Sequence, residues 1–368
     1  MLRIKEFIKK ETVFCAATVL AVLTMFFVPP SYQYVQYIDF RVLALLFCLM
    51  LVVAGFRSVG VFERMIQQLL PHMKNLRQLV FMLVLVCFFS SMWITNDVAL
   101  ITFVPFAILV LEAAGHREKL IFVITMQTIA ANLGSMCTPI GNPQNLYLYS
   151  LAEMSMIEFL KLMLPLTVVS LLLLVVAVFM VKPEKIVYEK AEKESGRFGW
   201  RIWGYAVLFV LCLLTVLRVI DYRLMLVLVV VAICFLNRRL YRNVDYMLLI
   251  TFVAFFIFVG NIKNMDSVKL FLESCVAGRE VVVAVLASQV ISNVPAAVLL
   301  SGVTENVQAL LIGTNIGGLG TLIASMASLI SYKLYIGTPN SRKGRYILEF
   351  TLYNLIFLIL LGAVTYFL

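Results

Sequence analysis

Apolar residues occur in long runs along this chain, and short polar segments rich in Lys and Arg separate the runs. A helix needs roughly 20 apolar residues to cross the hydrocarbon core of a bilayer, so the pattern predicts an all-α polytopic membrane protein. Full crossings are expected at 12–29, 40–57, 119–150, 157–181, 201–219, 222–236, 245–260, 304–337 and 345–367.

Several segments depart from the pattern of a plain spanning helix. The segments 119–150 and 304–337 are too long for one helix and contain Gly and Asn near the middle, so we expect broken helices. The segments 78–114 and 279–302 carry an Asn phrase between two short apolar arms. Arms of roughly 10 to 18 residues favour re-entrant hairpins, although two full crossings would preserve the same topology. The stretch 61–73 is amphipathic and is expected at the interface.

The polar phrases in these segments occur twice. The hairpin phrases are SMWITNDVA (Ser91–Ala99) and SQVISNVPA (Ser288–Ala296), and the broken-helix phrases are ANLGSMCTPIG (Ala131–Gly141) and TNIGGLGTLIA (Thr314–Ala324). In lipid, backbone that leaves a helix must be buried in protein or line a cavity. Matched Gly- and Asn-rich breaks in two halves therefore predict the binding site of a secondary transporter.

Two repeats follow from these matches. We predict repeat one at 12–181 and repeat two at 222–367, joined by 182–221, a charged cytoplasmic loop followed by a linking helix. Five crossings precede repeat two, which is an odd number, so the second repeat starts on the opposite face. The repeats are therefore expected to be inverted in the membrane.

Composition agrees with a membrane protein and limits its partners. Of the 368 residues 62% are hydrophobic and 14% are charged, and the mean hydropathy is +1.00. The net charge of +10 does not indicate a nucleic-acid partner, because 23 of the 30 Lys and Arg lie in loops that the crossing count places on one side. The bias predicts a multi-pass protein of the cytoplasmic membrane with a cytoplasmic N-terminus, whose first apolar run is retained.

The repeated phrases supply ligand groups. A helix break frees carbonyl oxygens, which suit sodium together with Ser, Thr and Asn oxygens, and amide groups, which suit an anion. Ser91 and Thr95 are four residues apart, which predicts that they share a helix face leading into Asn96. The second copy has the same spacing at Ser288, Ser292 and Asn293.

One ionisable residue distinguishes the halves. Asp97 has Val294 as its counterpart, and a charge at the bilayer centre costs at least roughly 2.5–3.5 kcal/mol. Asp97 is therefore expected to ligate a cation or to carry a proton. No Lys or Arg lies in the four phrases, so dipoles, hydroxyls and bound cations would hold an anion. The predicted substrate-binding residues are Asn96, Asp97, Thr138, Asn142, Asn145, Asn293 and Thr321.

The order of spans, hairpins and broken helices resembles the ion transporter superfamily over nearly the whole chain. That superfamily includes divalent anion–sodium symporters, citrate–metal permeases, arsenite-efflux permeases and some sodium–proton antiporters. Its dicarboxylate symporters carry Ser-Asn-Thr at each hairpin tip, whereas the tips here are Thr95-Asn96-Asp97 and Ser292-Asn293-Val294. The run TNDVALITFVP is more similar to the hairpin of arsenite permeases and related anion permeases.

The resemblance implies two cation sites, an elevator-type motion of the hairpin and broken-helix units, and a homodimer. No cofactor is expected, apart from sodium if it is the coupling ion. The implied cation-binding residues are Ser91, Thr95, Asn96, Gly134 and Ser135 in the first half, and Ser288, Ser292, Asn293, Gly317 and Gly318 in the second.

The sequence thus predicts a secondary active transporter of a small anion, driven by a sodium or proton gradient. Within transport the alternatives are arsenite or antimonite efflux and sodium–proton antiport centred on Asp97. A channel is another class, because inverted repeats with breaks at mid-membrane occur there too. An enzyme is not expected, because the chain has no HExxH, no GxGD and no GxSxG partnered by a membrane histidine.

Overall fold

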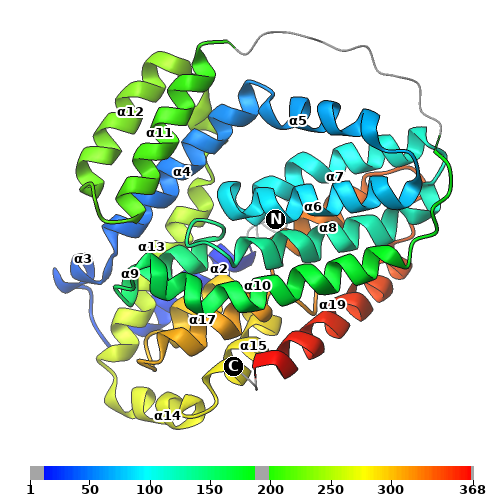
Figure 1. The fold of residues 1–368 in the computed structure, drawn as a ribbon. Helices are drawn as coiled ribbons and strands as arrows, with labels where there is room; N and C mark the ends of the chain where they lie inside the picture. The colour runs from blue at the N-terminus through cyan, green and yellow to red at the C-terminus, as the bar shows by residue number, and fades with distance from the viewer. Residues whose placement is uncertain (1–11, 187–198, 366–368) are drawn as a thin grey trace, which may run out of the picture.

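The computed structural model describes residues 12–186 and 199–365, which fold into helices without a strand (Figure 1). Within these residues seven helical segments are long and apolar enough to cross a membrane. This confirms an all-α polytopic membrane protein. The seven segments are α4 (Phe40–Ser58), α6 (Leu76–Ile94), α7 (Asn96–Ala113), α10 (Met156–Phe179), α12 (Tyr222–Asn237) with η3 (Arg238–Asn243), α13 (Tyr246–Lys263) and α19 (Lys343–Thr365).

Shorter helices connect or interrupt these segments. The parts of the predicted elements that fall on 1–11, 187–198 and 366–368 lie outside the described residues. The shorter helices are α2 (Thr12–Met25), α3 (Gln33–Tyr37), α5 (Val61–Leu69), η1 (Leu70–His72), η2 (Arg117–Lys119), α8 (Leu120–Ser135), α9 (Pro143–Leu151), α11 (Arg201–Val216), α14 (Asp266–Val276), α15 (Glu280–Ile291), α16 (Asn293–Leu300), α17 (Val307–Ile316) and α18 (Met326–Ile336).

The two hairpins differ in arm length. In the first, α6 and α7 have 19 and 18 residues, or about 28 and 27 Å at 1.5 Å per residue, which is enough to cross a bilayer. In the second, α15 and α16 have 12 and 8 residues and are too short to do so. The arms of the first hairpin therefore lie at the upper end of the expected length, because its apolar runs extend to the ends of both helices, and its re-entrant character stays a prediction.

Three elements at the outer parts of the fold differ from expectation. The first described helix, α2, ends at Met25, short of the predicted span 12–29. Helices α3 and α14 were not predicted, because each is too short for a membrane span and a search for long apolar runs misses it. Helix α14 carries the sequence DSVKLFLESCV, which alternates charged and apolar residues at helical spacing.

Loops that the charge count assigned to the cytoplasmic side meet at one end of the molecule. Arg77 Nε donates to the Val181 carbonyl at 2.7 Å, and the His116 ring lies 3.7 Å from the Glu184 carboxylate. The loop segments 57–77, 115–119 and 182–186 therefore lie together. The grouping agrees with the predicted parity of the crossings, while the side of the membrane on which this end lies stays a prediction.

Loops assigned to the other side also contact one another. Arg218 Nη1 donates to the Glu153 carbonyl at 3.0 Å, which joins the end of α11 to the end of α9. Arg41 Nη2 donates to the Thr215 carbonyl at 3.1 Å, which joins the start of α4 to the same region. Each of these arginines bonds a carbonyl near a helix end.

Two groups of helices build the core. Helix α4 packs with α11 and α12 into one bundle, where Gly55 lies against the ring of Tyr205 (Figure 1). Helix α8 packs between α6 and α7, α17 packs against α15 and α16, and α18 reaches across to α7 and α8. The second group buries the polar phrases, because all four repeated segments belong to it.

Candidate functional site

Both hairpin tips adopt the same unusual backbone conformation. A single residue links the arms of each hairpin: Thr95 has φ 69° and ψ 149°, and Ser292 has φ 73° and ψ 154°. Non-glycine residues rarely adopt this region, and each such position costs about 1–3 kcal/mol. The prediction that Ser91 and Thr95 share a helix face is wrong, as is its copy in the second half, because the helix ends one residue before each tip.

The asparagine after each tip starts the next helix and reaches across to a break. The backbone N–H of Asn96 donates to the Gly141 carbonyl at 3.1 Å, and that of Asn293 donates to the Ala324 carbonyl at 2.9 Å. Gly141 and Ala324 are the last residues of the two matched phrases. The two tips therefore rest on equivalent positions of the two breaks.

The threonine after each break holds that break on the neighbouring hairpin. The Thr138 hydroxyl donates to the Met92 carbonyl, and the Thr321 hydroxyl donates to the Gln289 carbonyl at 3.3 Å. Met92 directly follows Ser91, and Gln289 directly follows Ser288 at the equivalent position of the second hairpin, so the contact is again matched. In this conformation both predicted substrate-binding threonines are engaged with protein backbone.

Glycines allow the broken helices to approach the hairpins closely. A Cβ atom on Gly134 would lie 2.6 Å from Ser91 Oγ and would overlap the Phe88 carbonyl. A Cβ atom on Gly317 would lie 2.8 Å from Ser288 Oγ. Real Cβ atoms do not come this close, so each position requires glycine. The structure thus brings together the serine and the glycine that the resemblance assigned to each cation site.

Hydrogen bonds between the two halves join the breaks reciprocally. Asn142 is the N-cap residue of α9 and donates its amide to Asn315 Oδ1 at 3.0 Å. Ser325 is the N-cap residue of α18 and donates its hydroxyl to Asn132 Oδ1 at 3.0 Å. In each case the N-cap residue of the helix after one break bonds the asparagine that precedes the other break.

Asn132 and Asn315 are the site residues that sequence reasoning did not select. Asn132 accepts from Asn96 Nδ2 at 3.0 Å and donates to the Gly318 carbonyl at 3.4 Å. Asn315 donates to Asn145 Oδ1 at 2.6 Å. Both asparagines belong to the shared Asn-(Leu/Ile)-Gly motif, and that repetition is the signal that could have identified them.

Different residues brace the two breaks. Asn145 Nδ2 lies 3.3–3.4 Å from the carbonyls of Ser135, Met136 and Thr138. Its counterpart is Ser328, whose buried hydroxyl has no hydrogen-bond partner among the described residues. At the second break the brace is Gln289, whose Nε2 donates to the carbonyls of Gly317 and Leu319, at 2.9 and 2.8 Å.

The remaining predicted residues border these contacts. The Ser135 hydroxyl donates to the Asn132 carbonyl at 2.8 Å and accepts from Asn142 Nδ2 at 3.2 Å. Gly318 lies beside the Asn293 amide, where a Cβ atom would come within 2.9 Å of Nδ2. Asp97 is partly exposed, and its carboxylate forms no hydrogen bond or ion pair within 12–186 and 199–365.

The site is rich in neutral polar groups. Its side chains are amides and hydroxyls, its backbone contributes carbonyls at both breaks, and Asp97 is its only charged residue among those predicted. Gln144 adds a buried Oε1 without a partner among the described residues. Such groups can ligate a sodium ion or donate hydrogen bonds to a small oxygen-rich solute.

Comparison with known proteins gives consistent matches. A family model described as citrate transporter matches residues 2–330. An uncharacterized transporter of Methanocaldococcus jannaschii is 32% identical over 328 residues, which cover 89% of each chain. The inner membrane protein YbiR of Escherichia coli is 30% identical over 317 residues, covering 81% of this chain and 80% of its own. A silicon efflux transporter of Oryza sativa subsp. japonica is 35% identical over 130 residues, covering 35% and 26%.

Proposed function

Because the chain belongs to the citrate transporter family, we propose that it is a secondary active transporter of a small anion, driven by a sodium or proton gradient. It is a multi-pass membrane transporter and not an enzyme. The anion class, the coupling and the placement in the cytoplasmic membrane with a cytoplasmic N-terminus are parts of the proposal.

The observation that carries the proposal is the matched set of contacts at the two breaks. Two strained tips, two tip-to-break hydrogen bonds, two threonine contacts and two reciprocal bonds between halves recur at equivalent positions. Close packing alone would not require the same strained backbone conformation at both hairpin tips. Strain that persists twice at equivalent positions supports a binding role, since such strain is found at ligand sites. We infer that the halves are inverted repeats, 12–181 and 222–367.

The geometry suggests how the site would bind. Carbonyls near Gly134 and Gly317, with the serines that contact them, would hold the coupling cations. The amides of Asn96 and Asn293, with the residues after the breaks, would meet the anion. The bonds of Asn142 and Asn145 to Asn315 fill this region, so the substrate would displace them or enter after the halves separate.

The two helix groups suggest the motion. The hairpins and broken helices are linked across the halves by Asn142–Asn315, Ser325–Asn132 and Thr128–Ser331, so we infer that they move as one body. The bundle of α4, α11 and α12 would be the scaffold. Its outer face exposes large apolar side chains, which would contact lipid or a second copy in a homodimer: Trp203, Val207 and Phe235.

A second candidate function is efflux of an undissociated oxyacid such as arsenite or antimonite. The silicon efflux transporter among the relatives favours this class, although it matches only part of the chain. The predicted site offers amides and hydroxyls without a Lys or Arg, and such a site suits a neutral hydroxylated solute as well as an anion held by sodium. Sodium–proton antiport at Asp97 would need no such substrate contacts.

The test is thermal stability of the purified protein against a panel of organic and inorganic anions, with and without sodium. A ligand at 100 times its dissociation constant stabilises by about 2.7 kcal/mol, which a melting scan resolves. Stabilisation by sodium with a further gain from one anion supports a sodium-coupled anion transporter. Stabilisation by an undissociated oxyacid alone supports the second function, and no response to any solute under either condition contradicts both.

Flux measurements in proteoliposomes then separate a transporter from a channel. With the stabilising solute identified, a secondary transporter accumulates it against its own gradient when sodium or protons are supplied on one side. A channel only equilibrates the solute. Uptake that stops at equilibrium under every imposed gradient would refute coupled transport.

A further inference from the structure

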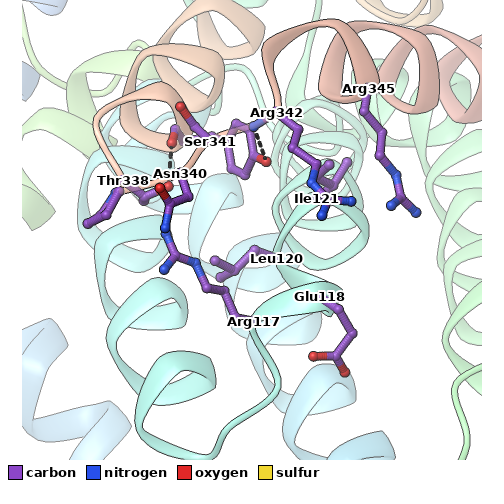
Figure 2. A pocket seen from close by; sticks show the side chains of 11 residues that line it. Arg117, Glu118, Leu120, Ile121, Thr338, Asn340, Ser341, Arg342 and Arg345 are labelled. Atoms are coloured by element: carbon purple, nitrogen blue, oxygen red, sulfur yellow. Dashed lines mark hydrogen bonds between the residues drawn. The ribbon is translucent and has the colours of Figure 1, made fainter.

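A cavity lies apart from the breaks, between links of the two halves. It has a volume of about 280 Å³ and is bordered by η2 and the start of α8 on one side. The loop 337–342 between α18 and α19 and the first turn of α19 form the other side (Figure 2). Both links belong to the end of the molecule where we predict the cytoplasmic loops.

Positive charge dominates this cavity. Its charged lining residues are Arg117, Arg342 and Arg345 with a single acid, Glu118. Figure 2 shows Glu118 at the rim, away from Arg342 and Arg345, and the Glu118 carboxylate lies 3.4 Å from the His116 ring. The arginines that line the cavity therefore outnumber the carboxylates that line it.

The arginines keep most of their donors available. Arg345 Nε pairs with Glu349 at 2.5 Å and Arg117 Nε pairs with Glu112 at 3.6 Å, so each contact engages one of five N–H groups. The guanidinium of Arg342 has no hydrogen bond or ion pair within 12–186 and 199–365, and only its backbone N–H is engaged, with Tyr335. A guanidinium group without a carboxylate partner, as at Arg342, favours an anion beside it.

Neutral groups and a helix end complete the lining. Asn340 adds a side-chain amide beside Arg117 (Figure 2). Helix α19 begins at Lys343 and has 23 residues, so its first N–H groups lack partners within the helix and its positive dipole end faces this region. Arginine forks together with unpaired backbone N–H groups match the oxygens of a phosphate group.

We propose that this cavity, the arginine cavity, binds the phosphate of an anionic ligand, either a phospholipid headgroup or a free phosphate. Basic pockets between membrane helices near the cytoplasmic side hold anionic headgroups. Arg117 comes from the link between α7 and α8, and Arg342 and Arg345 come from the link between α18 and α19. A bound phosphate therefore ties together the two halves outside the transport site.

The test uses the full-length protein, stripped of lipid in a neutral detergent, with three probes: phosphatidylglycerol, phosphatidylcholine and inorganic phosphate. We expect phosphatidylglycerol to raise the melting temperature and to remain bound in native mass spectra, while phosphatidylcholine does neither. Inorganic phosphate giving the same arginine-dependent rise would identify a free anion as the ligand. No response to phosphatidylglycerol or to phosphate would overturn the proposal.

The matched variants are two triple substitutions of equal charge. R117A/R342A/R345A should abolish the response, whereas R238A/R239A/R242A, on η3 away from the cavity, should retain it. An equal response in both triples would refute the site. If the first triple does not fold, Arg342→Ala decides alone, because that side chain has no partner to lose: binding should weaken about tenfold, the loss expected for one charge-assisted contact.

Discussion

The break between α8 and α9 is braced from the segment that follows it, whereas the break between α17 and α18 is braced from the neighbouring hairpin. Asn145 holds the carbonyls of the first break, and Gln289 holds those of the second. Neither residue has an amide counterpart in the other half, since their partners are Ser328 and Met92. Only the Met136 and Leu319 carbonyls are equivalent between the two sets, so the halves share one braced carbonyl and hold it with different side chains.

The halves also differ in the polar side-chain groups that they leave available to a ligand. Asn96 Nδ2 is bonded to Asn132 at 3.0 Å, and Asp97 follows it. Asn293 has its Oδ1 engaged with the Val294 N–H, while the contacts of the described residues include no acceptor for its Nδ2. The first half therefore supplies the charge, and the second half supplies a free amide. We infer that coupling depends chiefly on the first half and substrate contact on both.

Replacing the close-contact glycines should have the largest effect. Gly134→Ala should destabilise the protein by about 1–3 kcal/mol or more and stop transport, because the new methyl group meets fixed backbone at Phe88. Gly317→Ala should cost less, since its methyl group would lie 2.6 Å from the Gly313 carbonyl oxygen, a smaller overlap than that at Phe88. Gly362→Ala, with open space around it, is the control. Melting curves of equal shape for Gly134→Ala and Gly362→Ala would contradict the close approach.

Breaking the bonds between the halves should have the next largest effect. Asn315→Ala removes one of two acceptors of Asn142 Nδ2 and the donor to Asn145 Oδ1, and a buried polar group left unpaired costs about 1–3 kcal/mol. A double-mutant cycle with Asn142→Ala should show a coupling energy of about 0.5–3 kcal/mol in unfolding measurements. Purely additive effects would mean that the two side chains do not interact in solution.

Removing the second brace tests whether the carbonyl arrangement matters. Gln289→Met installs the residue of the first half and removes three hydrogen bonds to the break, to the carbonyls of Gly317 and Leu319 and from the Thr321 N–H. We expect a loss of about 1–2 kcal/mol in stability and weaker ligand-induced stabilisation. Gln308→Met, at an exposed position on α17, is the matched control. Unchanged ligand response in Gln289→Met would show that the break keeps its shape without the brace.

Neutralising Asp97 should change stability least and coupling most. Asp97→Asn removes a carboxylate that has no bonded partner in the described part of the chain, so the stability change should stay within about 0.5 kcal/mol. Driven uptake should lose its dependence on one gradient, sodium or proton, and the gradient that ceases to matter identifies the coupling ion. Asp266→Asn, on α14 outside the site, controls for loss of one charge. Uptake by Asp97→Asn that still depends fully on both the sodium and the proton gradient would show that Asp97 has no role in coupling.

Much of the fold followed from sequence because span length and loop charge are local properties. The long apolar runs became the spanning helices, and the paired phrases fell at tips and breaks. The conformation of Thr95 could not be predicted, because Ser91 and Thr95 also fit a continuing helix. The turn forms there because Asn96 rests on Gly141, which lies 45 residues along the chain.

The hydrogen bonds between the two halves could not be predicted from the sequence. Asn142 and Asn315 are 173 residues apart, and only the fold brings them together. The brace Gln289 was also missed, because its counterpart, Met92, is not an amide and a comparison of the repeats discards such positions. Asn145 was selected as a substrate-binding residue, but its bonds to the first break were not predicted. The arginine cavity was missed for a similar reason, since Arg117 and Arg342 belong to loops that looked like ordinary topology signals.

The most direct test of the central claim is ligand-induced stabilisation in the two tip variants. Asn96→Ala and Asn293→Ala should each lose the rise in melting temperature that sodium and the identified solute give the unaltered protein. Asn306→Ala, which removes a helix-capping asparagine at an exposed position, should keep that rise. Full retention of the rise in both tip variants would contradict a binding site built from the paired tips and breaks.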